Sequence, residues 1–535
     1  MNKTIRGFLA MALAAAGTAL SAPAQTPAGE PIIEFQTTLY EDMAAANAFH
    51  FVIGAKADTY IDVDCGYGSV EVEVGPAVFD QETQAISGTT VTGSVSSEGK
   101  VRIYGDASLI DYLDLEGCYI TDISFPALTE VAILNLNHNL LKRLDLSHMA
   151  NLEALYISDN PFGESPLVVG PGKPKLTIID MSLLGGLDES FNFSDYPALV
   201  SAQVWSVPTL RRADTSKCPE LMQLSIDATN VESVDLSKNP KLLILNVGDT
   251  RVNNLDLSHN PYLTELYCGH NGSMNSGYKF ETLDLSANTA LRRLNCAGNA
   301  LTQLDISMLP NLTDLSCQHN RLTSINIDSN PALVSVDISM NYMDFATIPA
   351  VRETFSEYFY YQNAISTGRQ HAVGTEIDLA AKVLRPESST SAVLYSLNRE
   401  HPSDATVVED EYYSYADGKV TFLKAYPDSV YVGFSNSALP DAQLATELFM
   451  IKEPADIGKP SVGATVNFSA VSSSLAFKVG MSGATPGNPV TFQVDFGDGN
   501  LKDFEAETNG MPSENNVTGK RAGATTTVYV PEGVQ

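Results

Sequence analysis

Three cysteines recur at one position of a repeating pattern, and this spacing could serve a metal site or a series of disulfides. They are Cys268, Cys296 and Cys317. In neighbouring repeats the same position holds leucine, isoleucine or valine, and a free cysteine packs like a small apolar side chain. Parallel side chains on adjacent strands also suit disulfide geometry poorly. We therefore predict buried thiols at this position, with no metal ligand and no catalytic cysteine.

Aspartates stand at a second repeated position and could bind calcium, which prefers clustered carboxylates. They are Asp145, Asp214, Asp235, Asp256, Asp284 and Asp305, and most are followed by leucine or isoleucine and then serine. An aspartate can equally accept hydrogen bonds from nearby backbone amides. We favour this local role and keep calcium as the alternative. Residues 495–500 resemble a calcium loop but lack its alternating carboxylates and final glutamate, so we predict a hairpin turn there.

A third set of residues could bind a ligand without transforming it. These are polar or aromatic residues beside recurring apolar pairs: Asp114, Asn135, Tyr156, Trp205, Asp227, Asn246, Tyr267, Asn295 and Gln318. Exposed aromatic rings among amides and carboxylates suit a sugar ring or a protein side chain. Trp205 is the only tryptophan, and it either faces the ligand or fills a gap in an irregular repeat. No G-x-S-x-G, H-E-x-x-H or phosphate-loop motif occurs, so we predict a binding protein and no enzyme.

All three sets belong to one repeat of about 21 residues in the middle of the chain. Apolar pairs separated by one residue begin at positions 113, 134, 155, 179, 202, 224, 245, 266, 294, 315 and 336. An apolar residue precedes each pair by three positions, and asparagine, cysteine or threonine often follows five positions after its start. This is the L-x-x-L-x-L-x-x-N/C signature of leucine-rich repeats. It predicts a mainly β solenoid of about eleven coils over residues 106–350, capped by about residue 364.

The repeat positions have physical roles. The paired apolar side chains should point inward from short strands and stack into one core, leaving the residues beside them on the concave face. The asparagine should turn inward and bond backbone groups at the bend. Leucine-aspartate-leucine-serine segments should lie on the convex side. The longest repeat contains seven extra residues, 271–277, which we predict to be a surface loop.

The regions outside the repeats predict β-sandwiches. Residues 25–105 and 456–535 share a pattern: 63–69 parallels 494–500, and 91–93 parallels 517–519. Residues 365–455 alternate apolar and polar residues between turns and predict a third sandwich. The first shared module leads directly into the solenoid, so we expect further sequence, and a second solenoid, beyond Gln535.

The N-terminus and the charge predict an exported protein. Residues 1–24 combine a basic start, a short apolar run and an Ala-Pro-Ala cleavage site, which indicates a signal peptide. No later segment is long and apolar enough to span a membrane. A net charge of −32 excludes nucleic acid as a partner. Because the acidity is spread over every module, the sequence links it to no single ligand.

The repeat unit at 291–299 and 301–307, with the β modules around it, resembles secreted leucine-rich-repeat surface proteins of the Bacteroidetes, which are similar to internalins. Residues 494–500 resemble the turn of polycystic-kidney-disease (PKD) domains, and residues 365–455 an immunoglobulin-like sandwich. The resemblance implies a secreted or cell-surface protein whose concave face binds a protein or glycan in adhesion. The alternative is a surface scaffold that self-associates through its repeats; the sequence predicts no cofactor and leaves the oligomeric state open.

Overall fold

The computed structural model describes residues 17–19, 29–38, 48–79, 86–163, 167–188, 191–269, 279–397 and 405–454, followed by six separate strands up to residue 530. It divides into two compact units: residues 1–341 with 351–360, and residues 342–350 with 361–535. The described residues are mainly β, and a single α-helix occurs among them, α2 (Ala380–Val383). The predicted loop 271–277 and all of the predicted signal peptide except β1 (Gly17–Ala19) lie outside the described residues.

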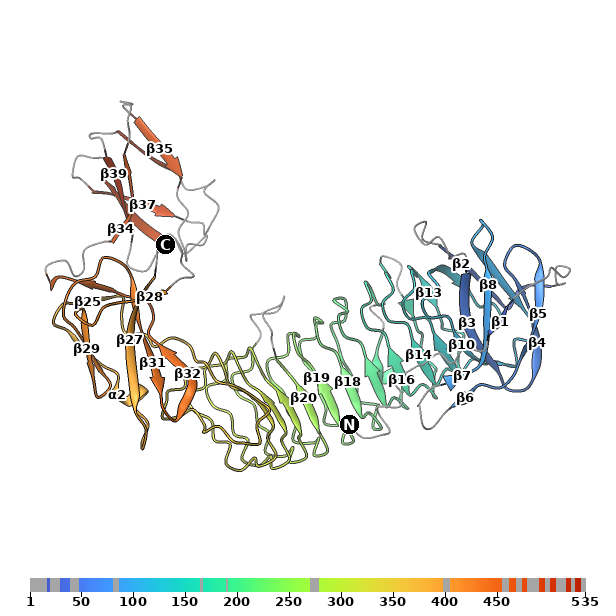
Figure 1. Ribbon diagram of the computed structural model, residues 1–535. Coiled ribbons are helices and arrows are strands. Elements are labelled where there is room, and N and C mark those ends of the chain that lie inside the picture. The colour runs from blue at the N-terminus through green and yellow to red at the C-terminus, as the bar shows by residue number, and fades with distance from the viewer. Residues whose placement is uncertain are drawn as a thin grey trace. The chain divides into compact units, whose positions relative to one another are not determined.

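Short parallel strands form the spine of the first unit, one for each predicted apolar pair (Figure 1). They are β10 (Ile110–Asp114), β12 (Ile133–Asn135), β14 (Ala154–Tyr156), β16 (Ile178–Asp180), β17 (Ser201–Gln203), β18 (Gln223–Ser225), β19 (Ile244–Asn246), β20 (Glu265–Tyr267), β21 (Arg293–Asn295), β22 (Asp314–Ser316) and β23 (Ser335–Asp337). The first apolar residue of each pair lies opposite its counterpart in the next coil, as Leu245, Leu266 and Leu294 do. The predicted mainly β solenoid of eleven coils is confirmed.

Where a described asparagine follows a strand at this position, it turns inward and connects neighbouring coils, as predicted. The side-chain nitrogen of Asn320 donates to the carbonyl oxygens of Cys296 and Cys317, each at 3.0 Å, and its oxygen accepts from the Leu301 amide at 3.0 Å. The same pattern of bonds is made by Asn139, Asn160, Asn299 and Asn341. These bonds satisfy buried backbone groups that the bend would otherwise leave unpaired.

A second asparagine ladder, not predicted above, runs along the back of the solenoid, mostly at asparagines that precede a proline. Its members are fully buried: Asn239, Asn260, Asn288 and Asn330. Asn260, for example, donates to the carbonyl oxygens of Leu236 and Asn239 in the preceding coil. Cys218 performs the same task with its thiol, which contacts the carbonyl of Phe193 at 3.2 Å. The solenoid is therefore bonded by side chains along two edges of its core.

The residue before the front asparagine column has a left-handed backbone in each coil where it is described. These residues are Gly117, His138, Asp159, Leu183, Ser206, Ala228, Asp249, Gly298, His319 and Met340, with φ between 51° and 70°. Only glycine adopts this conformation without a steric cost. The bend of the coil imposes the conformation on whatever residue stands there, so the residue types at this position do not reveal it.

The N-terminal sandwich is continuous with the first coil. Its inner pair, β3 (Ala48–Ala55) and β8 (Thr89–Ser94), extends the solenoid sheet because β3 pairs antiparallel with β10. Its second sheet runs β2 (Ile33–Thr37), β9 (Lys100–Tyr104), β4 (Thr59–Asp64) and β5 (Ser69–Val74), and β2 pairs with β11 (Ile120–Ser124) of the first coil. The module thereby covers the open end of the leucine core.

The other end of the stack carries β24 (Glu357–Phe359), which pairs parallel with β23. Arg352 donates to the carbonyl oxygens of Asn330 and Ile327, so an arginine completes the back ladder. Tilted aromatic rings pack next to it, with the centroids of Tyr358 and Tyr360 4.5 Å apart. Aromatic and charged side chains therefore shield the last coil.

The second unit contains two further β modules. The first has a four-stranded sheet in the order β28 (Ala405–Val407), β27 (Thr390–Leu397), β31 (Val430–Asn436), β32 (Leu439–Ala445), and a three-stranded sheet of β26 (Glu376–Asp378), β30 (Lys419–Phe422) and β29 (Tyr413–Ala416). Tyr415 and Phe434 pack one sheet against the other. The last module consists of β34 (Ser461–Asn467), β35 (Ser474–Lys478), β36 (Val490–Asp495), β37 (Leu501–Ala506), β38 (Asn516–Lys520) and β39 (Thr525–Val530).

Candidate functional site

The outward side of the parallel sheet from β10 to β24, here called the strand face, carries the predicted ligand-binding residues. Each strand presents three positions there: the residue before its central apolar residue, the residue after it, and the residue two further on. In β19, for example, these are Ile244, Asn246 and Gly248. Stacking of the coils aligns these positions into three columns along the solenoid.

Most of the predicted binding residues are partly exposed on the strand face: Asp114, Trp205, Asp227, Asn246, Tyr267, Asn295 and Gln318. Two are not. Asn135 is fully buried and donates to the Glu116 carboxylate at 2.9 Å, so it positions a neighbour and does not itself face solvent. Tyr156 is only 9% exposed and packs with Ala154, Ile178 and Ile133. The expectation that both would be exposed is wrong, because side chains of adjacent coils cover them.

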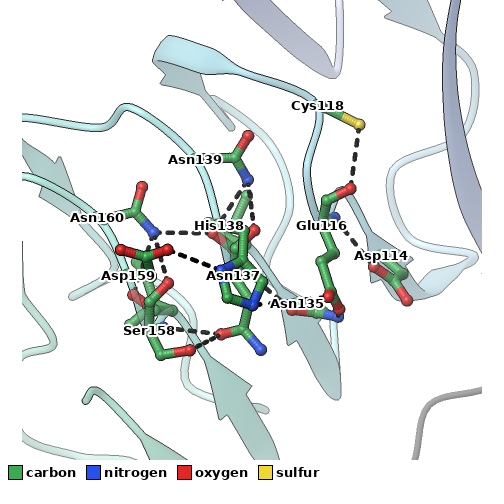
Figure 2. Close-up of polar contacts among 12 residues, drawn as sticks. Asp114, Glu116, Cys118, Asn135, Asn137, His138, Asn139, Ser158, Asp159 and Asn160 are labelled. Atoms are coloured by element: carbon green, nitrogen blue, oxygen red, sulfur yellow. Dashed lines mark hydrogen bonds and ion pairs between the residues drawn. The ribbon is translucent and has the colours of Figure 1, made fainter. Parts of the chain in front are cut away.

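A connected polar network occupies the N-terminal part of the strand face (Figure 2). His138 joins two carboxylates, with Nδ1 2.9 Å from Asp159 and Nε2 4.0 Å from Glu116. Beside it, the Asn137 side-chain oxygen accepts from the amide and the hydroxyl of Ser158. His138 and Asp159 both have a left-handed backbone, and both side chains are exposed. The network connects side chains of the first three coils, Glu116, His138 and Asp159, into one polar surface.

The C-terminal part of the face has a different composition. Tyr267 donates to the Glu265 carboxylate at 2.9 Å, and Arg293 lies between that carboxylate and Asp314, at 3.7 and 3.5 Å. In the third column, the one that contains Gly248, the residues between Asp227 and Gln318 are all small. They are Gly248, Gly269 and Ala297. Hydrogen bonds and ion pairs hold the side chains of this region in place, and such preorganisation suits the binding of a ligand.

Carboxylates are the main charged residues in the three columns of the strand face. They are Asp114, Glu116, Asp180, Asp227, Glu265, Asp314, Asp337 and Glu357. Arg293 is the one basic residue in these columns, and the other basic residues of segment 106–350 lie elsewhere on the coils. The charged residues of the strand face are therefore almost all acidic, a bias that the distribution of acidity over the modules does not show. The sequence could have revealed Asp180, which holds the same repeat position as Asn246 in a less regular coil.

Several of these carboxylates are held in surroundings that disfavour their charge. Burial raises the pKa of the Asp227 carboxyl to about 6, and the Asp249 carboxylate nearby acts in the same direction. Burial also raises the pKa of Asp114 and of Asp180. One oxygen of Asp227 is buried and accepts no hydrogen bond from the described residues. A cation bound to this face would therefore be attracted by carboxylates whose negative charge is only partly compensated by their neighbours.

The two repeated columns considered for metal binding have structural roles. Cys268, Cys296 and Cys317 are fully buried and free, and burial raises the pKa of the Cys296 thiol to about 12. The prediction of buried thiols is confirmed. Each aspartate of the back column accepts a hydrogen bond from the amide two residues on, always that of a serine, as Asp235 does from Ser237 at 2.9 Å. The predicted local backbone role is confirmed, and the described residues contain no cluster suited to a metal ion.

The stacked coils, the paired leucines and the asparagine ladders define a leucine-rich-repeat solenoid with two covered ends. Comparison with protein-family models gives no match, and comparison with curated proteins gives none. Similar solved structures include the functional domain of InlJ from Listeria monocytogenes, which includes a cysteine ladder (16% identity, TM-score 0.36, 65% of this chain and 93% of that one). Others are the internalin InlF from Listeria monocytogenes (17%, 0.39, 47% and 81%) and a leucine-rich-repeat protein of Leptospira interrogans (15%, 0.36, 46% and 73%). The class assignment rests on the repeat geometry itself.

Among the described residues, no helix is long and apolar enough to cross a membrane.

Proposed function

We propose that the protein is a secreted or cell-surface binding protein whose strand face recognises a basic segment of a protein ligand. The observation that carries the proposal is the row of partly buried carboxylates on that face, with Arg293 as the only basic residue in its columns. Lysine and arginine side chains complement such a row. The signal-peptide pattern at residues 1–24 supports export.

A protein ligand fits the face better than a neutral glycan does. Carboxylates and amides bond sugar hydroxyls, but a neutral sugar leaves the charge of desolvated carboxylates uncompensated. A cationic side chain compensates it and can also lie over an aromatic ring. Trp205, in the same column as Asp227, and Tyr267, in the neighbouring column, are partly exposed and could supply such rings. Adhesion to a basic protein surface is the role that this combination supports.

The test compares carboxylates on opposite sides of the solenoid. The probe is a lysine-rich peptide of about 20 residues, measured by calorimetry at low and physiological salt, with a panel of neutral oligosaccharides alongside. The double variant Asp180→Asn/Asp227→Asn should weaken peptide binding about ten-fold, since each charged contact contributes roughly 0.5–1 kcal/mol. The matched control Asp235→Asn/Asp256→Asn changes charge equally on the back column and should alter affinity less than two-fold. Equal losses in both variants, or tight binding of a neutral sugar only, would refute the proposal.

Trp205 provides a second test of the same surface. Trp205→Ala should weaken peptide binding while leaving the melting temperature within a few degrees, because the ring is partly exposed. A large fall in melting temperature would identify Trp205 as core.

The alternative function, a scaffold that self-associates through its repeats, predicts oligomers that grow with concentration in light scattering. A strand face whose charged residues are almost all acidic opposes self-association at low salt.

A further inference from the structure

The last β module repeats the strand pairing of the module that covers the start of the solenoid. In the first module β4 pairs with β9 through Val63 and Ile103; in the last, β36 pairs with β39 through Val494 and Val528. The sheets have the same order, β2-β9-β4-β5 and β34-β39-β36-β37. The segments that are similar in sequence therefore also pair their strands in the same way.

The second strand pair of each module agrees residue by residue. Phe51 of β3 lies opposite Val91 of β8, and Phe477 of β35 lies opposite Val517 of β38. All the pairs between β35 and β38 match pairs between β3 and β8 at one constant spacing along the chain. Agreement of register across two separate strand pairs indicates one module present twice, because a slip by one residue would reverse the faces.

In its first occurrence the module takes the place that a preceding coil would have next to the first coil of the solenoid. Within the solenoid, Asn139 donates to the Leu115 carbonyl of the preceding coil at 2.9 Å. In the first coil the equivalent residue is Cys118, and its thiol donates to the His50 carbonyl of β3 at 3.0 Å. The Thr37 hydroxyl at the end of β2 donates in turn to the Cys118 carbonyl at 2.7 Å. The strand edges of β3 and β2 thus receive β10 and β11.

We infer that the strands β34–β39 form a second solenoid cap, whose β34 and β35 edges accept the first coil of a leucine-rich-repeat solenoid. By the shared register, Ala476 takes the place of His50, and Thr465 and Asn467 take the places of Glu34 and Gln36. Among the described residues β34 and β35 have a paired strand on one side only, where β2 and β3 have one on both. An edge strand with unpaired amides binds another strand readily, and a solenoid end requires such a cover.

The direct test exchanges the two modules within the full chain. Residues 32–105 are replaced by residues 460–531, and deletion of residues 29–105 serves as the uncapped reference. Hydrogen exchange is then measured in the first coil, residues 110–124. The exchanged chain should protect these amides to within about ten-fold of the natural chain, whereas the deletion should lose protection by a hundred-fold or more. A replacement of the same region by residues 365–454, the unrelated sandwich, should behave like the deletion.

A mixing experiment covers the case in which the exchanged module fails to fold in its new position. The 29–105 deletion chain presents an uncapped first coil and is titrated into the natural chain, with Asn467→Pro placed in the deletion chain to block its own module. A one-to-one complex is expected. Asn467→Pro in the natural chain should weaken the complex at least ten-fold, because alternation along β2 directs the equivalent amide, that of Gln36, toward the coil. Val407→Pro, on the edge strand β28, is the matched control and should leave it unchanged.

Protection in the exchanged chain supports the inference, and so does a complex that Asn467→Pro disrupts. Failure of both overturns it, as does a complex that is indifferent to Asn467→Pro. Neither readout involves the strand face, so the proposed binding function can fail without affecting this result.

Discussion

Truncation of one ladder residue, Asn320→Ala, tests whether the asparagine ladder holds the coils together. The Asn320 side chain is 4% exposed. It belongs to the coil of β22 and bonds the coil of β21 at Cys296 and at Leu301. Alanine keeps the backbone conformation but removes the bonds to the Leu301 amide and to the carbonyl oxygens of Cys296 and Cys317.

The expected loss follows from what each backbone group retains. The Cys296 carbonyl keeps a bond from Asn299 at 2.9 Å, and the Cys317 carbonyl keeps one from Asn341 at 3.0 Å. The Leu301 amide loses its side-chain acceptor and is left buried. One unsatisfied buried donor costs about 1–3 kcal/mol and each weakened acceptor about 0.5 kcal/mol, giving about 3 kcal/mol in all. The loss should be local, because each coil contacts only its neighbours.

Urea denaturation with hydrogen exchange resolved by segment measures this loss. Amides of β21 and β22 should exchange about a hundred-fold faster in Asn320→Ala, while those of β12 and β14 should be unchanged. Asn254→Ala, an exposed asparagine of the same solenoid, is the control and should change stability by less than 0.5 kcal/mol. A loss in Asn320→Ala no larger than in this control would refute the role assigned to the ladder.

Four further outcomes are expected. Gly298→Ala should destabilise the protein by about 1 kcal/mol in thermal unfolding, because φ is 70° there, whereas Gly163→Ala, where a Cβ meets open space, should not. Burial lowers the pKa of Lys173 to about 8 while its Nζ donates to the Leu146 carbonyl, so the folded state holds fewer protons than the unfolded state between pH 8 and 10.5. The free energy of unfolding should therefore rise across that window by up to about 3 kcal/mol, and Lys173→Met should flatten the profile. Peptide affinity should fall as pH drops from 7.5 to 5, since Asp227 with a pKa of about 6 becomes neutral, and Asp227→Asn should reduce this dependence. Excess EDTA should leave the melting temperature unchanged, because serine amides already bond the back column of aspartates; a fall of several degrees would indicate a bound cation.

The repeat made much of the fold predictable. An apolar pair recurring about every 21 residues defines strand, core position and bend at once, so each predicted pair became a strand. The roles of Cys268, Asp235 and Asn320 also followed from their columns, because a column shows what every coil tolerates at one place. In a solenoid, contacts in space lie one repeat apart in sequence, and this makes local pattern informative.

The candidate site was predictable only in part. The rule that residues beside the apolar pair face outward placed Trp205 and Tyr267 correctly, yet it also predicted Asn135 and Tyr156 to be exposed. Their burial depends on the size and packing of side chains in adjacent coils. The same holds for Asp227, whose raised pKa is a property of its surroundings and not of its position in the repeat.

By itself the sequence determined the solenoid, its core, the front ladder and the residues that stand beside the apolar pairs, because these follow from residue type at a fixed period. Only the tertiary structure decided how the coils end, which carboxylates are desolvated, and that the last module shares the strand register of the cap over the first coil. Each of these depends on side chains and strand edges brought together from distant or irregular segments. A periodic pattern carries no information about them, because they arise where the period begins, breaks or stops.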